Sequence, residues 1–156
     1  MKLAEALSLR ANALRRIEQL RARIVSNARY QEGEEPAEDA AALLTEVEGV
    51  IDEYESLIRR INRTNAATAI GADGTLTDAL ARRDALRWRH HVVNAAADAA
   101  AGNNQQGYSR QRRSELKMLS ALRVADLRSQ ADRVARELRE LDVRIQQSNW
   151  EVDLLD

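Results

Sequence analysis

The strongest constraint on this chain is a repeat in which apolar residues recur at alternating spacings of four and three. One series consists of Leu43, Val47, Val50, Tyr54, Leu57 and Ile61. A second series, in strict register, consists of Val124, Leu127, Ala131, Val134, Leu138, Leu141 and Ile145. An α-helix brings positions with this spacing onto one narrow face, as in helices that pack side by side. The repeat therefore predicts an all-α fold.

Two further segments also have helical periodicity. The first carries Leu3, Leu7, Leu14, Ile17, Leu20, Ile24 and Ala28 on one broad face, and the second carries Ala81, Ala85, Trp88, Val92, Ala95 and Ala99. We expect helices at about 2–29, 36–64, 77–101 and 124–148 within a single helical domain, 1–156. Short connections between long helices favour an elongated antiparallel four-helix bundle, or paired helical hairpins, with coiled-coil-like packing.

Boundary residues support these ranges. Pro36 is tolerated at the first position of a helix, and the carboxylates of Glu34 and Glu35 favour a helix N-terminus. Gly71 and Asp73-Gly74 are turn signals. Thr75 or Thr77 can cap the third helix, with Asp78 in its first turn.

The stretch between the third and fourth helices is harder to assign. Residues 102–113 read GNNQQGYSRQRR, which predicts a loop. Leu116, Met118, Ser120 and Leu122 alternate with their neighbours, so a short extended segment near 115–122 and a frayed helical turn both fit. Tyr108 beside Arg110, Arg112 and Arg113 could stack on a base and contact a phosphate backbone. One basic triplet in a neutral chain instead favours an exposed loop, and no nucleic-acid partner is expected.

Composition bears on partners. Of 156 residues, 27 are Ala and none is Phe, so a monomeric core would be thin, and subunit association into a homo-oligomer would compensate. The basic residues are 22 Arg and two Lys against 25 acidic residues, which favours ion pairs between helices. A net charge of -1 gives no overall field that would attract nucleic acid or anionic lipid.

The sequence lacks the residues and motifs that mark several classes of enzyme and binding site. There is no Cys, no GxSxG elbow and no phosphate-binding loop, so a non-enzymatic role is favoured and no cofactor is expected. No apolar run is long enough to span a bilayer and no export signal is evident, so we expect a cytoplasmic protein with no membrane partner. His91, Asn94 and Asp98 have the spacing of metal ligands on a helix, but a solvated or Asp-paired histidine is the simpler interpretation, and no metal is expected.

The best candidate site is polar region 61–84, where the apolar pattern stops. Its chemically active members are Asn62, Arg63, Asn65, Thr77, Asp78, Arg82, Arg83 and Asp84. Three of these are arginines, which could converge on a small anionic ligand or on carboxylates of another subunit. The alternative, favoured here, is a polar turn that satisfies its own backbone through capping side chains.

Four blocks of the chain carry a resemblance to a known family. They are MKLAEALSLRA at the start, GEEPAED at the first turn, INRTNAAT with LTDALARRD in the polar region, and RELDVRIQQSNW near the end. Together they resemble the septicolysin-like bacterial proteins over nearly the whole chain. Residues 102–113 and the LSALR segment depart from the pattern. The resemblance implies a small helical protein, and the family name implies a cytolysin, but it carries over no catalytic residue.

Three functional hypotheses follow. The first is a helical structural or interaction protein that self-assembles through coiled-coil faces, because Leu44, Ile51 and Ile58 make the second helix wider than one partner needs. The second is a septicolysin-like, membrane-active cytolysin. The third is a protein or enzyme that binds a small anion or a metal through the polar 61–84 region.

Overall fold

The structure is a computed structural model that describes residues 1–103 and 116–156. Its helices are α1 (Leu3–Asn27), α2 (Ala40–Ala67), α3 (Leu76–Ala100) and α4 (Val124–Glu151), and a short 3-10 helix, η1 (Gly71–Asp73), separates α2 from α3. In the described ranges the backbone forms no strand, so the all-α prediction is confirmed. The chain divides into two compact units. Unit 1 comprises Met1–Thr77 and Gln146–Asp156, and unit 2 comprises Asp78–Ile145.

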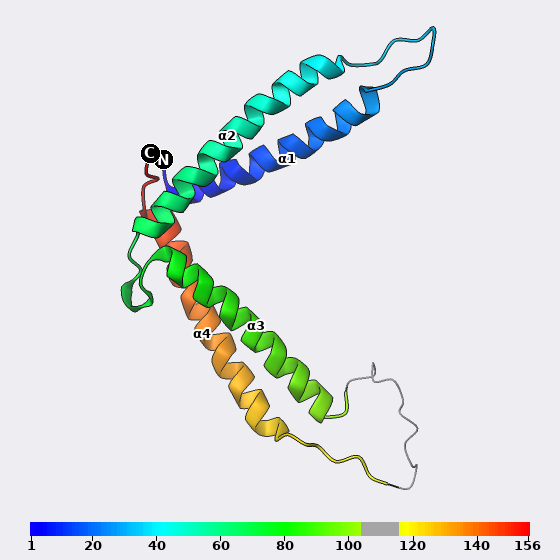
Figure 1. The fold of residues 1–156 in the computed structure, drawn as a ribbon. Coiled ribbons are helices and arrows are strands. Elements are labelled where there is room, and N and C mark those ends of the chain that lie inside the picture. The colour runs from blue at the N-terminus through cyan, green and yellow to red at the C-terminus, as the bar shows by residue number, and fades with distance from the viewer. Residues whose placement is uncertain (104–115) are drawn as a thin grey trace. The chain divides into compact units, whose positions relative to one another are not determined.

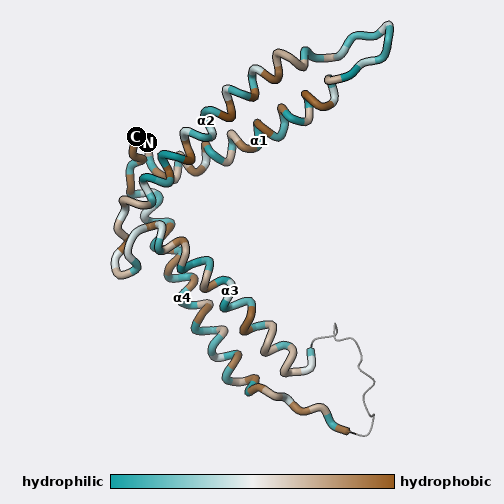
Figure 2. Tube along the Cα trace, in the orientation of Figure 1, coloured by the Kyte–Doolittle hydropathy of each residue, from teal (hydrophilic) through white to brown (hydrophobic). Residues whose placement is uncertain are grey.

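In unit 1, α1 and α2 form a helical hairpin and run side by side (Figure 1). Leu20, Leu43 and Val47 form its buried cluster, and Ile17, Ile24 and Val50 pack against them. Leu57 and Ile61 continue the buried face of α2, which confirms the face predicted from the four-three spacing. Hydrophobic and hydrophilic residues alternate along the helices, as this packing requires (Figure 2).

The far end of this hairpin explains why α2 begins later than expected. The Asp39 carboxylate accepts hydrogen bonds from the backbone N–H groups of Ala41 and Ala42, at 2.9 and 3.2 Å, and so caps a helix that begins at Ala40. The predicted start at Pro36 is therefore wrong by four residues. Capping by Asp39 satisfies orphan N–H groups, which proline at the first helical position does not do.

Glu38 ties the same end of the hairpin to α1. Its carboxylate accepts from the Arg23 guanidinium, with Nε and Oε2 2.9 Å apart, and its backbone N–H donates to Asn27 Oδ1 at 3.0 Å. The hydrogen bond from Arg23 lowers the pKa of Glu38 and raises that of Arg23. Arg16 on α1 likewise pairs with Glu46 on α2, so arginine–carboxylate pairing between helices is observed here.

In unit 2, α3 packs along α4 (Figure 1), with Arg128 bound to Asp98 at 2.7 Å across the pair. On α4 the buried residues are Ala131, Val134, Leu141 and Ile145, as predicted. On α3 they are Ala79, Leu86, Val93 and Ala97. The predicted α3 face is therefore wrong, because Trp88 and Val92 from that face are 69% and 60% exposed. α3 has two apolar stripes, and the one containing Leu86 and Val93 packs against α4.

The segment before α4 has no regular structure. Residues 116–123 form neither helix nor strand, so the predicted extended segment near 115–122 is wrong over 116–122, while residue 115 lies outside the described residues. Leu116, Met118 and Leu119 are exposed and have no neighbouring strand, and the N–H of Leu122 donates locally to Ser120 Oγ at 3.3 Å. Tyr108 and the Arg110, Arg112, Arg113 triplet also lie outside the described residues.

Candidate functional site

The polar 61–84 region begins in the last turns of α2 and ends in the first turns of α3. Between them the backbone makes a small hairpin, in which Leu76 N–H donates to Thr68 O and Ile70 N–H donates to Gly74 O, both at 2.8 Å. Gly74 has φ 83° and ψ −126°, a conformation that is open essentially to glycine alone. The turn expected from the glycines is therefore present, and it is held by backbone hydrogen bonds.

The start of α3 distinguishes the two candidate caps. The helix begins at Leu76, so Thr75 occupies the position that precedes it, whereas Thr77 lies inside the helix and is exposed. Asp78 stands in the first turn, where a carboxylate is favoured by the helix dipole. Of the predicted site residues, Thr77 and Asp78 therefore occupy positions that a helix start accounts for.

The three candidate arginines belong to different units. Arg63, on α2 in unit 1, donates from Nη1 to the backbone oxygen of Asp156 at 2.9 Å. Arg82, on α3 in unit 2, lies 3.6 Å from a carboxylate oxygen of Glu137 on α4. Convergence of these arginines on one anion stays a prediction. The remaining predicted residues lie on α2 (Asn62, Asn65) and on α3 (Asp84).

Arg83 is the most enclosed of the three arginines, with a side chain only 23% exposed. Its guanidinium lies 3.7 Å from Asp84 and 4.0 Å from Asp142 of α4. Its Nε is buried and makes no hydrogen bond with a described residue. The positive charge of Arg83 therefore lies beside the contact between α3 and α4, and the carboxylates of Asp84 and Asp142 flank this charge.

Thr64 is a buried polar residue that the sequence analysis missed. It is fully buried on α2, and its hydroxyl donates to Arg60 O at 2.8 Å and accepts from the N–H of Leu155 at 3.0 Å. Arg60 in turn donates from Nε to Leu155 O at 3.0 Å. The spacing of the buried residues on α2 could have identified Thr64, because Thr64 lies three residues after Ile61 and so continues the four-three pattern.

The two ends of unit 1 pair with each other beside this threonine. Leu3 N–H donates to Val152 O at 2.9 Å and Leu154 N–H donates to Met1 O at 2.8 Å, forming an isolated antiparallel bridge. Lys2 Nζ lies 2.9 Å from an Asp153 carboxylate oxygen. This hydrogen bond from Lys2 lowers the pKa of the Asp153 carboxyl. Leu3 is fully buried, so the bridge closes the end of the α1–α2 hairpin.

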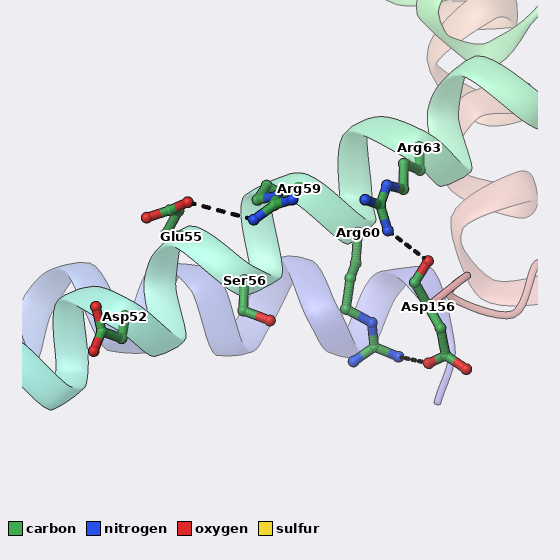
Figure 3. A pocket seen from close by; sticks show the side chains of 7 residues that line it. All are labelled: Asp52, Glu55, Ser56, Arg59, Arg60, Arg63 and Asp156. Atoms are coloured by element: carbon green, nitrogen blue, oxygen red, sulfur yellow. Dashed lines mark hydrogen bonds and ion pairs between the residues drawn. The ribbon is translucent and has the colours of Figure 1, made fainter.

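Arg60 and Arg63 also line a pocket of about 310 Å³ on the outer surface of α2 (Figure 3). Its walls are Asp52, Glu55, Ser56, Arg59, Arg60, Arg63 and Asp156. Both Arg60 and Arg63 point toward Asp156, and Arg60 Nη2 donates to its Oδ1 at 2.8 Å. Arg59 points toward Glu55, 3.7 Å away. Because all three guanidiniums have an acidic or carbonyl partner, an incoming anion would have to compete with contacts inside the chain.

The outer face of α3 is the second candidate site. The outer face of α3 consists of the exposed residues Ala81, Ala85, Trp88, Val92, Ala95 and Ala99. The Trp88 and His91 rings meet edge to face, with centroids 5.9 Å apart. Because the buried residues of α3 lie on its opposite side, this apolar face is exposed in the part of the chain that the structure describes.

The histidine cluster does not assemble around a metal position. Asn94 lies 3.0 Å from a ring nitrogen of His90, and Asp98 pairs with Arg128. Across residues 1–103 and 116–156, no group of three or more His, Asp or Glu side chains is arranged to hold a metal ion. Nor does any helix in those ranges have the length and apolar character needed to cross a membrane.

Comparison with known proteins gives a family. Residues 10–154 match a family of unknown function (DUF6847), and the chain belongs to that family. The chain is also similar to a solved structure described as a functionally unknown conserved protein from Corynebacterium diphtheriae. That protein is 39% identical, with a TM-score of 0.89 and 99% of each chain covered. No curated protein matches the chain.

Proposed function

We propose that this chain is a non-enzymatic helical protein that self-assembles, with the outer face of α3 as its principal association surface. The observation that carries the proposal is the exposure of Trp88 and Val92, at 69% and 60%, on a face with coiled-coil spacing. The same spacing marks residues that are buried against a partner helix on α2 and α4. A second helix laid on the outer face of α3 would bury it in the same way.

The side chains on this face suit close helix packing. Alanines at 81, 85, 95 and 99 allow two backbones to approach closely, and Trp88 supplies a large apolar area at the centre. Tryptophan is among the residues enriched at the energetic centres of protein interfaces. A buried indole with small neighbours would therefore account for most of the association energy.

A smaller apolar strip on α2 offers an alternative surface. Leu44 and Ile51 lie seven residues apart and are 51% and 39% exposed. The sequence predicted that both residues widen the apolar face of α2, so that it could contact a second neighbouring helix. In the described part of the chain both side chains remain exposed. Variants at Leu44 therefore test whether α2 rather than α3 mediates association.

Native mass spectrometry on gently purified protein is the direct test, because it reports subunit number and any retained ligand together. We expect a discrete oligomer that Trp88→Glu dissociates and Leu44→Glu leaves intact. A wild-type protein that is monomeric at concentrations up to hundreds of micromolar would overturn self-assembly. An oligomer dissociated only by Leu44→Glu would move the surface to α2.

The other two hypotheses give different readouts. A reproducible added mass that is lost in Arg63→Ala would favour a small-ligand site in the 61–84 region instead. Dye release from liposomes at micromolar protein would favour the membrane-active role that the septicolysin-like resemblance implies. If the chain acts only by self-assembly through Trp88, we expect neither an added mass nor dye release.

A further inference from the structure

We propose that two copies of this chain pair through α3 in the parallel orientation, with Asp84 of each copy facing Arg89 of the other. This inference rests on the proposed self-assembly and adds the partner, the direction of the helices and the residues that select it. The observation that supports the parallel orientation is the distribution of charge along the two edges of the outer face of α3.

The outer face can be placed in the seven-residue repeat of a coiled coil. Ala81, Trp88 and Ala95 then occupy one core position (d), and Ala85, Val92 and Ala99 occupy the other (a). The edge that precedes each a position carries Asp84, His91 and Asp98, which is acidic or neutral. The edge that follows each d position carries Arg82, Arg89 and Ala96, which is basic or neutral.

These edges discriminate between the two directions of pairing. In a parallel pair, a residue on the first edge faces the residue five positions later on the second edge of the partner, so Asp84 faces Arg89. In an antiparallel pair, each edge faces its own counterpart. Arginines would then face arginines and aspartates would face aspartates, which is destabilising. The charges therefore favour the parallel orientation.

The surroundings of these two residues leave them able to pair between copies. Arg89 is exposed and has no ion-pair partner among the residues that the structure describes. Within the described ranges, Asp84 forms ion pairs only with arginines of its own helix, Arg83 at 3.7 Å and Arg87 at 3.6 Å, which are loose distances for an ion pair. By contrast, Asp98 is already bound to Arg128 at 2.7 Å. Asp84 and Arg89 are thus the charges best placed to define the pairing.

Single-cysteine cross-linking tests the orientation, and the absence of native Cys makes it clean. Ala81→Cys and Ala95→Cys occupy equivalent core positions about 21 Å apart along α3. In a parallel pair each position meets its own copy, so each variant alone should form a disulfide-linked dimer on mild oxidation, because a disulfide needs Cα atoms within about 7 Å. Ser8→Cys, exposed on α1, is the control and should remain uncross-linked.

An antiparallel pair would give the opposite pattern. Neither Ala81→Cys nor Ala95→Cys would cross-link alone, whereas a mixture of Ala81→Cys and Ala99→Cys would give a mixed dimer, because a positions pack against d positions when the two helices run in opposite directions. That result would overturn the proposed orientation and leave self-assembly standing. An oligomer in which neither the single variants nor the mixture cross-links would overturn the use of α3. A protein that stays monomeric would instead remove the proposed function itself.

Charge exchange tests the named pair independently. We expect Asp84→Arg and Arg89→Asp each to raise the dissociation constant on the order of tenfold, because each places like charges opposite one another at two symmetric sites. The double variant should restore most of the wild-type affinity measured by sedimentation equilibrium. Asp132→Arg, an exposed change of the same charge on α4, is the matched control and should have little effect. A double variant as weak as the singles would overturn the Asp84–Arg89 pairing.

Discussion

The N–H of Leu155 donates to the hydroxyl oxygen of Thr64 at 3.0 Å, joining the last residues of the described chain to the final turns of α2. The same hydroxyl donates to Arg60 O at 2.8 Å, so its donor and one acceptor site are both used. Because Thr64 is fully buried, water cannot replace either partner. One side chain thus connects the helix interior to a segment 91 residues away.

Replacing Thr64 by Val should lower the free energy of unfolding by about 0.5–1.5 kcal/mol, the net contribution of a hydrogen bond, because the N–H of Leu155 loses its acceptor. Urea denaturation measures this change. Thr45→Val is the matched control, because Thr45 is an exposed residue of α2 whose hydroxyl makes the same type of bond, to Ala41 O at 3.2 Å. Equal effects of the two substitutions would contradict a structural role for the Thr64–Leu155 contact.

The two glycines at 49 and 74 should respond in opposite directions to alanine. Gly74 has φ 83°, so Gly74→Ala should destabilise the protein by about 1–3 kcal/mol. Gly49 lies inside α2, and a Cβ added there meets nothing within 4 Å, so Gly49→Ala should stabilise by about 0.5–1 kcal/mol. Thermal and urea unfolding measure both changes. Stabilisation by Gly74→Ala would show that the α2–α3 turn has a different conformation.

Adjacent valines on α3 test which of its faces is buried. Val93 is 8% exposed and Val92 is 60% exposed. In dilute protein, Val93→Ala should lower the free energy of unfolding by roughly 1–3 kcal/mol, whereas Val92→Ala should change it little. At high protein concentration Val92→Ala should weaken association instead. If Val92→Ala proved the more destabilising in dilute protein, the face first predicted from the sequence would be the buried one.

At low pH the Lys2–Asp153 ion pair should no longer stabilise the folded state. Because Lys2 lowers the pKa of Asp153 in the folded state, the pair stabilises the protein above the unfolded pKa of aspartate, near 3.9. That contribution disappears as the pH falls through the lowered folded value. The stability difference between wild type and Asp153→Asn should therefore be present at pH 7 and vanish in strong acid.

Asp132→Asn provides the comparison, because Asp132 is exposed and pairs with no cation among the described residues. Because this substitution removes no ion pair, Asp132→Asn should differ little from wild type in its free energy of unfolding at pH 7. A difference for Asp153→Asn that persists at the lowest pH would mean that the substitution acts through the backbone bridge rather than through charge.

Much of the fold could be predicted because helix formation depends on local periodicity. Four helices, their order and most of their boundaries follow from the spacing of apolar residues and from the glycines at 71 and 74. The buried face of α2 was also predictable, since Leu57 and Ile61 lie on its one continuous apolar seam. The late start of α2 depended on a competition between Pro36 and Asp39 that local preferences do not decide.

The sequence by itself determined that this chain folds as helices with apolar faces, because that pattern is a property of each helix alone. Only the tertiary structure decided which stripe of α3 is buried, since both stripes have helical spacing and the choice depends on packing against α4. It also decided that Thr64 is buried and that Arg63 binds Asp156 while Arg82 pairs with Glu137. These contacts join residues far apart in sequence, so no local preference specifies them.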